Sequence, residues 1–130
     1  SKLTCWQGQL GNEPISTSFR KDLKLVDGIK EHVVEIAAGY AFSVAVTSAG
    51  EVYTFGQNDR GQLGTGEDET ALHATPVMIP AKYFKYEKHP KTYYYEIEHV
   101  CAGDNHVVVT TKDSKVMFSW GDNCTFFIIN

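Results

Sequence analysis

Histidine and cysteine side chains are the ones most able to bind a metal ion or to act in nucleophilic catalysis, and here they are scattered along the chain. The five histidines are His32, His73, His89, His99 and His106, and the three cysteines are Cys5, Cys101 and Cys124. Neither set shows the paired short spacing of a zinc site. No serine or cysteine has an identifiable base and orienting acid beside it. We therefore expect no catalytic residue, no metal site and no cofactor, and we expect the cysteines to be reduced, buried thiols.

A glycine-rich segment, 56–66, is the next feature with chemical potential, because some glycine-rich loops cradle phosphate. Such a loop ends in Lys followed by Ser or Thr and leads into a helix whose N-terminus faces the anion. Here three acidic residues, 67–69, follow the segment instead. We therefore predict a structural role for these glycines, which permit positive φ angles and a close approach of neighbouring backbones.

Lysines and tyrosines are interleaved in the segment 82–95, which holds four lysines, five tyrosines and one glutamate. Such a mixture could grip a phosphate backbone and stack on bases, but it equally suits a protein-binding surface or a covered loop. The net charge of −4 argues against a broad nucleic-acid surface, so we favour protein contact. The residues predicted to touch a partner are Lys82, Tyr83, Lys85, Tyr86, Lys88, Lys91 and Tyr93.

Length and hydropathy set the class of protein. The 130 residues, of which 42% are hydrophobic, suffice for one folded domain with a core. No run of about 18 apolar residues occurs, and the first residues lack the apolar core of a signal peptide. We therefore expect an intracellular protein with no membrane insertion.

The elements that position these residues follow from an internal repeat. The sequence 36–39 recurs as 100–103 at a shift of 64 residues, and 52–58 recurs as 117–123 at a shift of 65. A periodicity of this length is typical of repeat architectures. The repeat also isolates an insertion of about eleven residues between Ile79 and Ile97.

A third, shorter copy lies at the start of the chain. Gly8-Gln9-Leu10-Gly11 repeats the sequence 61–64, and Trp6 stands where the later copies have Phe55 and Trp120. An aromatic residue that holds one position in three copies marks a packing site. We therefore predict that Phe55 and Trp120 are buried at equivalent places between neighbouring repeats.

Within each copy the local chemistry favours β-strands. Alternating β-branched and aromatic residues predict hairpins over 42–55 and 106–120. The run 75–79 contains Pro76, which suits an outer edge strand because proline cannot donate a ladder hydrogen bond. With a preceding strand over 34–38, each repeat forms a four-stranded antiparallel sheet. Repeats of about 50 residues with four strands predict an all-β fold of β-propeller blades.

The segment 34–76 resembles the regulator of chromosome condensation repeat, a family of seven-bladed propellers. It carries Ala38-Gly39, Gly50-Glu51-Val52-Tyr53, Phe55-Gly56 and the run 61–66 in the family's order. Two positions depart from the pattern: Phe42 replaces a histidine that His106 preserves, and Cys124 begins a stretch that replaces the expected Gly-Gln-Leu-Gly. The resemblance implies an incomplete ring, or a fragment of a longer chain.

The expected domains are a partial repeat at 1–33, a repeat at 34–96 with its insertion at 80–96, and a degenerate or truncated repeat at 97–130. In the resembled family, propellers serve as protein-interaction scaffolds, as parts of ubiquitin ligases and as exchange factors for a small GTPase. We therefore expect a non-catalytic scaffold that binds other proteins or a large assembly. The alternative is a chromatin-associated guanine-nucleotide exchange factor. The family implies a nuclear or cytoplasmic place, the latter including the cytoskeleton and cilia.

Overall fold

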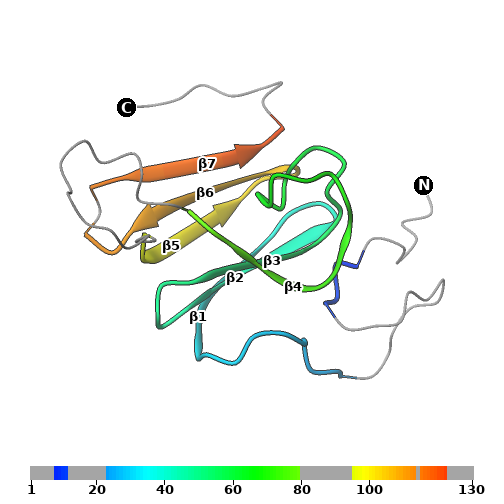
Figure 1. The fold of residues 1–130 in the computed structure, drawn as a ribbon, viewed down its shortest axis with the longest axis horizontal. Coiled ribbons are helices and arrows are strands. Elements are labelled where there is room, and N and C mark those ends of the chain that lie inside the picture. The colour runs from blue at the N-terminus through cyan, green and yellow to red at the C-terminus, as the bar shows by residue number, and fades with distance from the viewer. Residues whose placement is uncertain (1–7, 12–22, 80–94, 114, 123–130) are drawn as a thin grey trace, which may run out of the picture.

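A computed structural model of the chain describes residues 8–11, 23–79, 95–113 and 115–122, which form two antiparallel sheets (Figure 1). The first sheet, called blade 1, has the order β1-β2-β3-β4 and the second, blade 2, has the order β5-β6-β7. The strands are β1 (Val33–Ala38), β2 (Phe42–Thr47), β3 (Val52–Gly56), β4 (Ala71–Val77), β5 (Ile97–Ala102), β6 (His106–Thr111) and β7 (Met117–Gly121). No helix occurs in the described residues, so the predicted all-β class is confirmed.

The two blades repeat each other in register as well as in sequence. Ala37 pairs with Val44 in blade 1, and the residues 64 positions later, Cys101 and Val108, pair in blade 2. The pairs β1–β2 and β5–β6 also have an irregularity at the same place, after Val33 in β1 and after Ile97 in β5. Because a bulge bends and twists a strand, both blades begin with the same local shape.

The outer strand of blade 1 is the edge strand that the sequence predicts, although it begins at Ala71, four residues earlier than expected. Pro76 lies opposite Tyr53 in the pairing of β4 with β3, and β4 has no further strand beside it in the described part of the chain. The missing N–H of proline therefore costs no inner ladder bond.

The core lies between the blades. Apolar side chains of blade 1 pack on those that blade 2 turns towards it, and the buried cluster comprises Phe42, Val44, Val46, Val52, Leu63, Val77, Ile97, Val100, Val107 and Val109. Phe42, Val44 and Val46, at alternate positions of β2, are at most 1% exposed, and Ala45 and Thr47 on the other face of the strand are buried as well. Burying one valine side chain stabilises a fold by about 1.5–3 kcal/mol, so the interface holds the blades together.

The number of strands in blade 2 and the exposure of Cys101 differ from the predictions. Blade 2 has three strands in the described residues instead of four, and the segment in which a fourth would lie, 123–130, is outside them. Cys101 is exposed rather than buried, because it alternates with Val100, whose side chain faces blade 1. Cys5 and Cys124 lie outside the described residues.

Candidate interaction surfaces

Each glycine-containing loop covers the aromatic residue of the following repeat. A Cβ atom on Gly11 would lie 2.8 Å from the Phe55 ring, and one on Gly64 would lie 2.7 Å from the Trp120 ring. Trp120 also donates a hydrogen bond from Nε1 to the carbonyl oxygen of Gln62, at 3.0 Å. The predicted equivalence is confirmed, with Phe55 7% exposed and Trp120 partly buried. The partner of each ring is a loop of the preceding repeat rather than its sheet.

The segment 56–66 is shaped by its own hydrogen bonds. Asn58 is fully buried, accepts from the backbone N–H of Leu63 at 3.0 Å and donates to the carbonyl oxygen of Glu67 at 2.8 Å. Gly64 and Gly66 have φ angles of +68° and +81°, which side chains rarely permit. The glycines thus have the structural role that the sequence predicts, and the structure adds that their loop covers Trp120.

His106 serves packing, and His99 serves surface pairing. The rings of His106 and its equivalent Phe42 both lie on a glycine, Gly103 and Gly39 respectively, at distances that leave no room for a Cβ atom. His99 Nδ1 in β5 lies 3.2 Å from Glu35 Oε2 in β1. Within the described ranges no three His, Cys, Asp or Glu side chains come together as a metal site would require. His89 is outside these ranges.

Blade 1 presents an apolar surface on the side away from blade 2. Ile36 in β1 is 75% exposed and Val33 is 39% exposed, although their equivalents in β5, Val100 and Ile97, are 5% and 1% exposed. The difference arises because blade 1 covers the residues of β5, while nothing described covers those of β1. Equivalent positions of β1 and β5 therefore differ in burial. The exposed side of blade 1 has the apolar residues that form an interface in blade 2.

The predicted partner-binding segment leaves and rejoins the fold at a narrow base. Its residues Lys82, Tyr83, Lys85, Tyr86, Lys88, Lys91 and Tyr93 lie outside the described residues, in the range 80–94. The flanking residues are described: the N–H of Tyr95 donates to the carbonyl oxygen of Ile79 at 3.1 Å. Tyr95 also packs on Phe118, with the ring centroids 4.9 Å apart. The two ends of the insertion are therefore held side by side.

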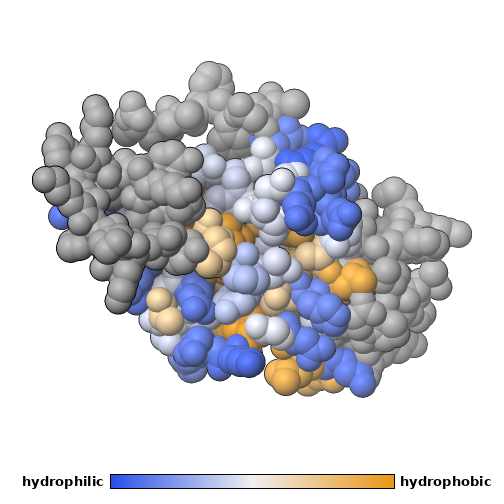
Figure 2. Space-filling view, in the orientation of Figure 1, coloured by the Kyte–Doolittle hydropathy of each residue, from blue (hydrophilic) through white to orange (hydrophobic). Residues whose placement is uncertain are grey.

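A cavity of about 510 Å³ lies beside this base, at the seam of the two blades. Its lining comes from three places: the turn between β2 and β3 with the start of β3, the end of β4, and the start of β5. Figure 2 shows hydrophobic surface near the end of β4. The residues that line the cavity are Ala49, Gly50, Glu51, Val52, Tyr53, Pro76, Val77, Met78, Ile79, Tyr95, Glu96 and Ile97.

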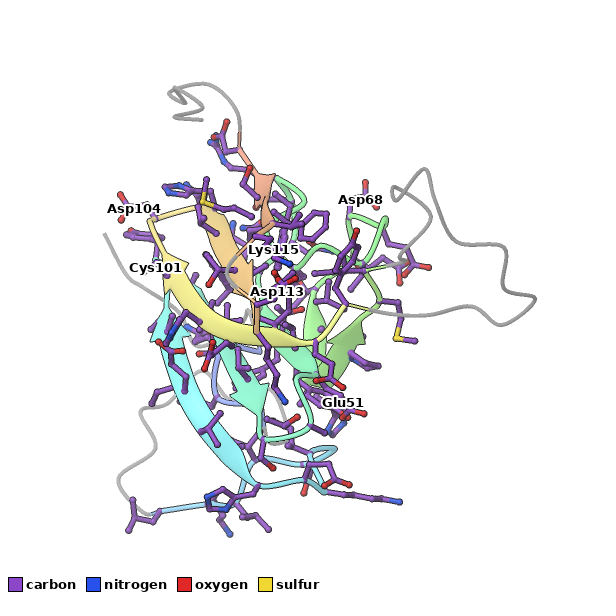
Figure 3. All side chains as sticks on the ribbon, turned by 90° about the vertical axis from the view of Figure 1, so that its left-hand side faces the viewer. Glu51, Asp68, Cys101, Asp104, Asp113 and Lys115 are labelled. Atoms are coloured by element: carbon purple, nitrogen blue, oxygen red, sulfur yellow. The ribbon has the colours of Figure 1, made fainter. Side chains whose placement is uncertain are left out.

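Two carboxylates belong to this cavity. Glu51 accepts a hydrogen bond from the Tyr53 hydroxyl at 2.9 Å, and Glu96 lies 3.2 Å from the ammonium group of Lys112. The hydrogen bond to Glu51 is the main reason that the pKa of Tyr53 is raised above its ordinary value, with burial and the charges of Glu51 and Glu31 adding to it. Figure 3 shows Glu51 near the beginning of β5, far from Cys101 and Asp104 at its other end.

Sequence reasoning missed this cavity. Its walls come from the separate segments 49–53, 76–79 and 95–97, and each segment by itself has the sequence of an ordinary turn or strand end. The one local signal is Met78, a large apolar residue directly after the edge strand, which is 55% exposed.

Comparison with known proteins identifies the repeat. Two models described as the regulator of chromosome condensation (RCC1) repeat match residues 49–110 and 33–62. The human regulator of chromosome condensation is 36% identical over 121 residues, which cover 92% of this chain and 25% of the relative. The chain belongs to the RCC1 repeat family. It spans about a quarter of the length of this relative.

Solved structures agree with this assignment of the fold. Human WBSCR16 has a TM-score of 0.64 and 25% identity, with 88% of this chain and 26% of that chain covered. Yeast RCC1 (Prp20), in a crystal structure with Kap60, has a TM-score of 0.66 at 20% identity, with 91% of this chain and 26% of that chain covered. The two sheets are therefore blades of an RCC1-type β-propeller.

RCC1 repeats also occur within enzymes whose catalytic parts lie elsewhere. The human E3 ubiquitin-protein ligase HERC2 is 32% identical over 104 residues, which cover 79% of this chain but 2% of the ligase. The repeat propeller itself is in general a non-catalytic fold and serves as a protein-interaction domain. In the described part of the chain, no helix is long and apolar enough to span a membrane.

Proposed function

We propose that this chain is part of a propeller that acts as a non-catalytic protein-interaction scaffold. The observation that supports the proposal is that residues repeated in the sequence have structural roles. Phe55 and Trp120 pack under loops of the preceding repeat, and Asn58 holds its own loop by hydrogen bonds. Residues that define the repeat thus build the frame, and the surfaces between and beside the blades remain for binding. We propose an intracellular place, nuclear or cytoplasmic, for this scaffold.

The alternative function is guanine-nucleotide exchange, favoured by the identity to the human regulator of chromosome condensation. The crystal structure of yeast Prp20p is described with the binding properties of that protein to Gsp1p and histones. An experiment separates the two: the intact protein is mixed with Gsp1p loaded with a fluorescent guanine nucleotide. The scaffold predicts release at the intrinsic rate, whereas acceleration by about tenfold or more would replace it with an exchange factor.

We further propose that the insertion at 80–96 contacts a partner protein and that the units 1–33, 34–96 and 97–130 are successive repeats. Tyrosine rings offer a large contact area with few torsions to fix, and lysines steer the encounter towards an acidic surface. Replacing Tyr83, Tyr86 and Tyr93 together with serine should preserve folding and weaken partner binding by about 2 kcal/mol or more.

The test is an affinity measurement on the intact protein, with cross-linking mass spectrometry used to find the partner. The matched control replaces Tyr40 with serine, since Tyr40 is 57% exposed and lies outside the insertion. Loss of folding in the triple variant, with normal binding by whatever remains folded, would make the tyrosines core residues and refute the proposal.

A further inference from the structure

The cavity at the seam of the blades has apolar walls and an acidic rim. Val77 and Ile97 are 8% and 1% exposed and line it, while Glu51 and Glu96 are exposed at its edge. The walls join two blades: the N–H of Ile97 donates to the carbonyl oxygen of Gly50 at 2.9 Å. The cavity is thus continuous with the packed interface, and its shape is fixed by that interface.

The charges around the cavity select its occupant. Glu96 is paired with Lys112, which also donates to the carbonyl oxygen of Ser48 at 3.0 Å, so this carboxylate already has a cation beside it. Glu51 has the Tyr53 hydroxyl as a neutral donor, and Glu31 adds a further negative charge near that tyrosine. Among the described residues the rim therefore has two carboxylates and one paired cation, and this excess of negative charge disfavours an anion and favours a cation.

A lysine or arginine side chain meets both conditions, because it has an aliphatic stem and a charged end. We propose that this cavity binds a lysine or arginine side chain on a segment of a partner protein, with the stem against Val77 and Met78 and the charge at Glu51. The inference rests on the proposed scaffold function and adds the place and chemistry of one contact. A purely apolar side chain would cover part of the Glu51 carboxylate and offer it no charge, so that the Tyr53 hydroxyl alone would replace the lost water.

The probe is N-acetyl-lysine methylamide, titrated into the isotope-labelled full chain and followed by NMR amide shifts. The expected shifts concentrate on residues 50–53 and 95–97, and they are about threefold smaller with N-acetyl-norleucine methylamide, which has the stem without the charge. Equal shifts with both compounds, or shifts spread over all acidic surfaces, would overturn the proposal.

A pair of variants with equal charge change tests the role of Glu51. Glu51→Gln should weaken lysine binding by about threefold, the effect of one exposed ion pair, whereas Glu67→Gln on the exposed loop should leave it unchanged. Met78→Ser should also weaken binding, since it removes part of the wall. If Glu67→Gln weakens binding as much as Glu51→Gln does, the attraction is general and the proposal is wrong.

Two further outcomes separate this inference from the proposed function. Partner binding that is unaffected by Glu51→Gln would leave the scaffold function intact and refute the cavity as its contact. In a second variant, a glycine-serine linker replaces residues 82–93. If lysine binds only to this variant, the chain's own segment competes for the cavity, and a partner protein is refuted as the occupant.

Discussion

At the scale of single residues, Trp120 and Gly64 form the contact that best explains why the repeat has its sequence. The ring rests where a side chain on Gly64 would have to be, and its Nε1 donates to Gln62 in the same loop. Glycine is needed here twice, for its φ of +68° and for the space above its Cα atom. The same logic applies to Gly11 and Phe55 in the preceding repeat.

Gly64→Ala and Gly66→Ala should therefore differ in their effect on stability. Both residues have positive φ, which costs alanine about 1–2 kcal/mol, but only the Cβ atom at position 64 meets Trp120. We expect Gly64→Ala to lower the free energy of unfolding by about 1–3 kcal/mol more than Gly66→Ala, measured by chemical denaturation. Equal costs for the two variants would show that the loop does not press on the ring.

The raised pKa of Tyr53 gives a pH-dependent signal at the cavity. Because Glu51 holds the neutral phenol in the folded state, this contribution to stability is present below the ordinary pKa of 10.0 and is lost as the pH rises through the higher folded value. Glu51→Ala should move the pKa of Tyr53 down towards that ordinary value, as followed by NMR of the labelled ring carbon. Glu67→Ala is the control, and an equal movement in both variants would contradict the assignment.

At the scale of elements, the strands were predictable where alternation is strict and turns are marked. The hairpins over 42–55 and 106–120 correspond to β2 with β3 and β6 with β7, because β-branched residues alternate there around glycine-containing or polar turns. The start of β4 was predicted too late, since Ala71 to Ala74 lack strong β-formers. Of these four residues only Ala71 pairs with β3, opposite Gly56, beyond an irregularity in the register.

The cavity and the exposure of Cys101 could not be predicted in the same way. Both depend on which side of a strand faces the neighbouring blade, a property of the packing of two distant segments. Repeat spacing identifies equivalent positions, but burial differs between copies: Val100 is covered and Ile36 is not.

The turn between β2 and β3 couples the two blades through Gly50. A Cβ atom there would lie 2.6 Å from the Cβ and 2.8 Å from the Cα of Glu96, so little can move aside. Gly50→Ala should loosen the seam and expose the hydrogen bond from the Ile97 amide to residue 50, at a cost of about 1–3 kcal/mol beyond that of Gly66→Ala. Hydrogen exchange at Ile97 measures this directly, and unchanged protection would disprove the coupling.

At the scale of the whole molecule, the apolar side of blade 1 is explained by the way blade 2 packs. Val33 and Ile36 occupy the positions of Ile97 and Val100, which the interface buries. In a propeller each blade packs on the next, so we expect a further blade to cover these residues in the intact protein. This expectation follows from the equivalence of positions in the repeat.

Three substitutions in the intact protein test whether blade packing repeats around the propeller: Ile36→Ala, Val100→Ala and Val34→Ala. Val34 is 55% exposed and its equivalent Glu98 is also exposed, so it is the matched control on the same strand. Repeated blade packing predicts that Ile36→Ala and Val100→Ala each lower the free energy of unfolding by about 2–4 kcal/mol, and Val34→Ala by less than about 0.5 kcal/mol. Repeated blade packing would be contradicted if Ile36→Ala changed the free energy of unfolding as little as Val34→Ala does, while Val100→Ala lowered it by the expected amount.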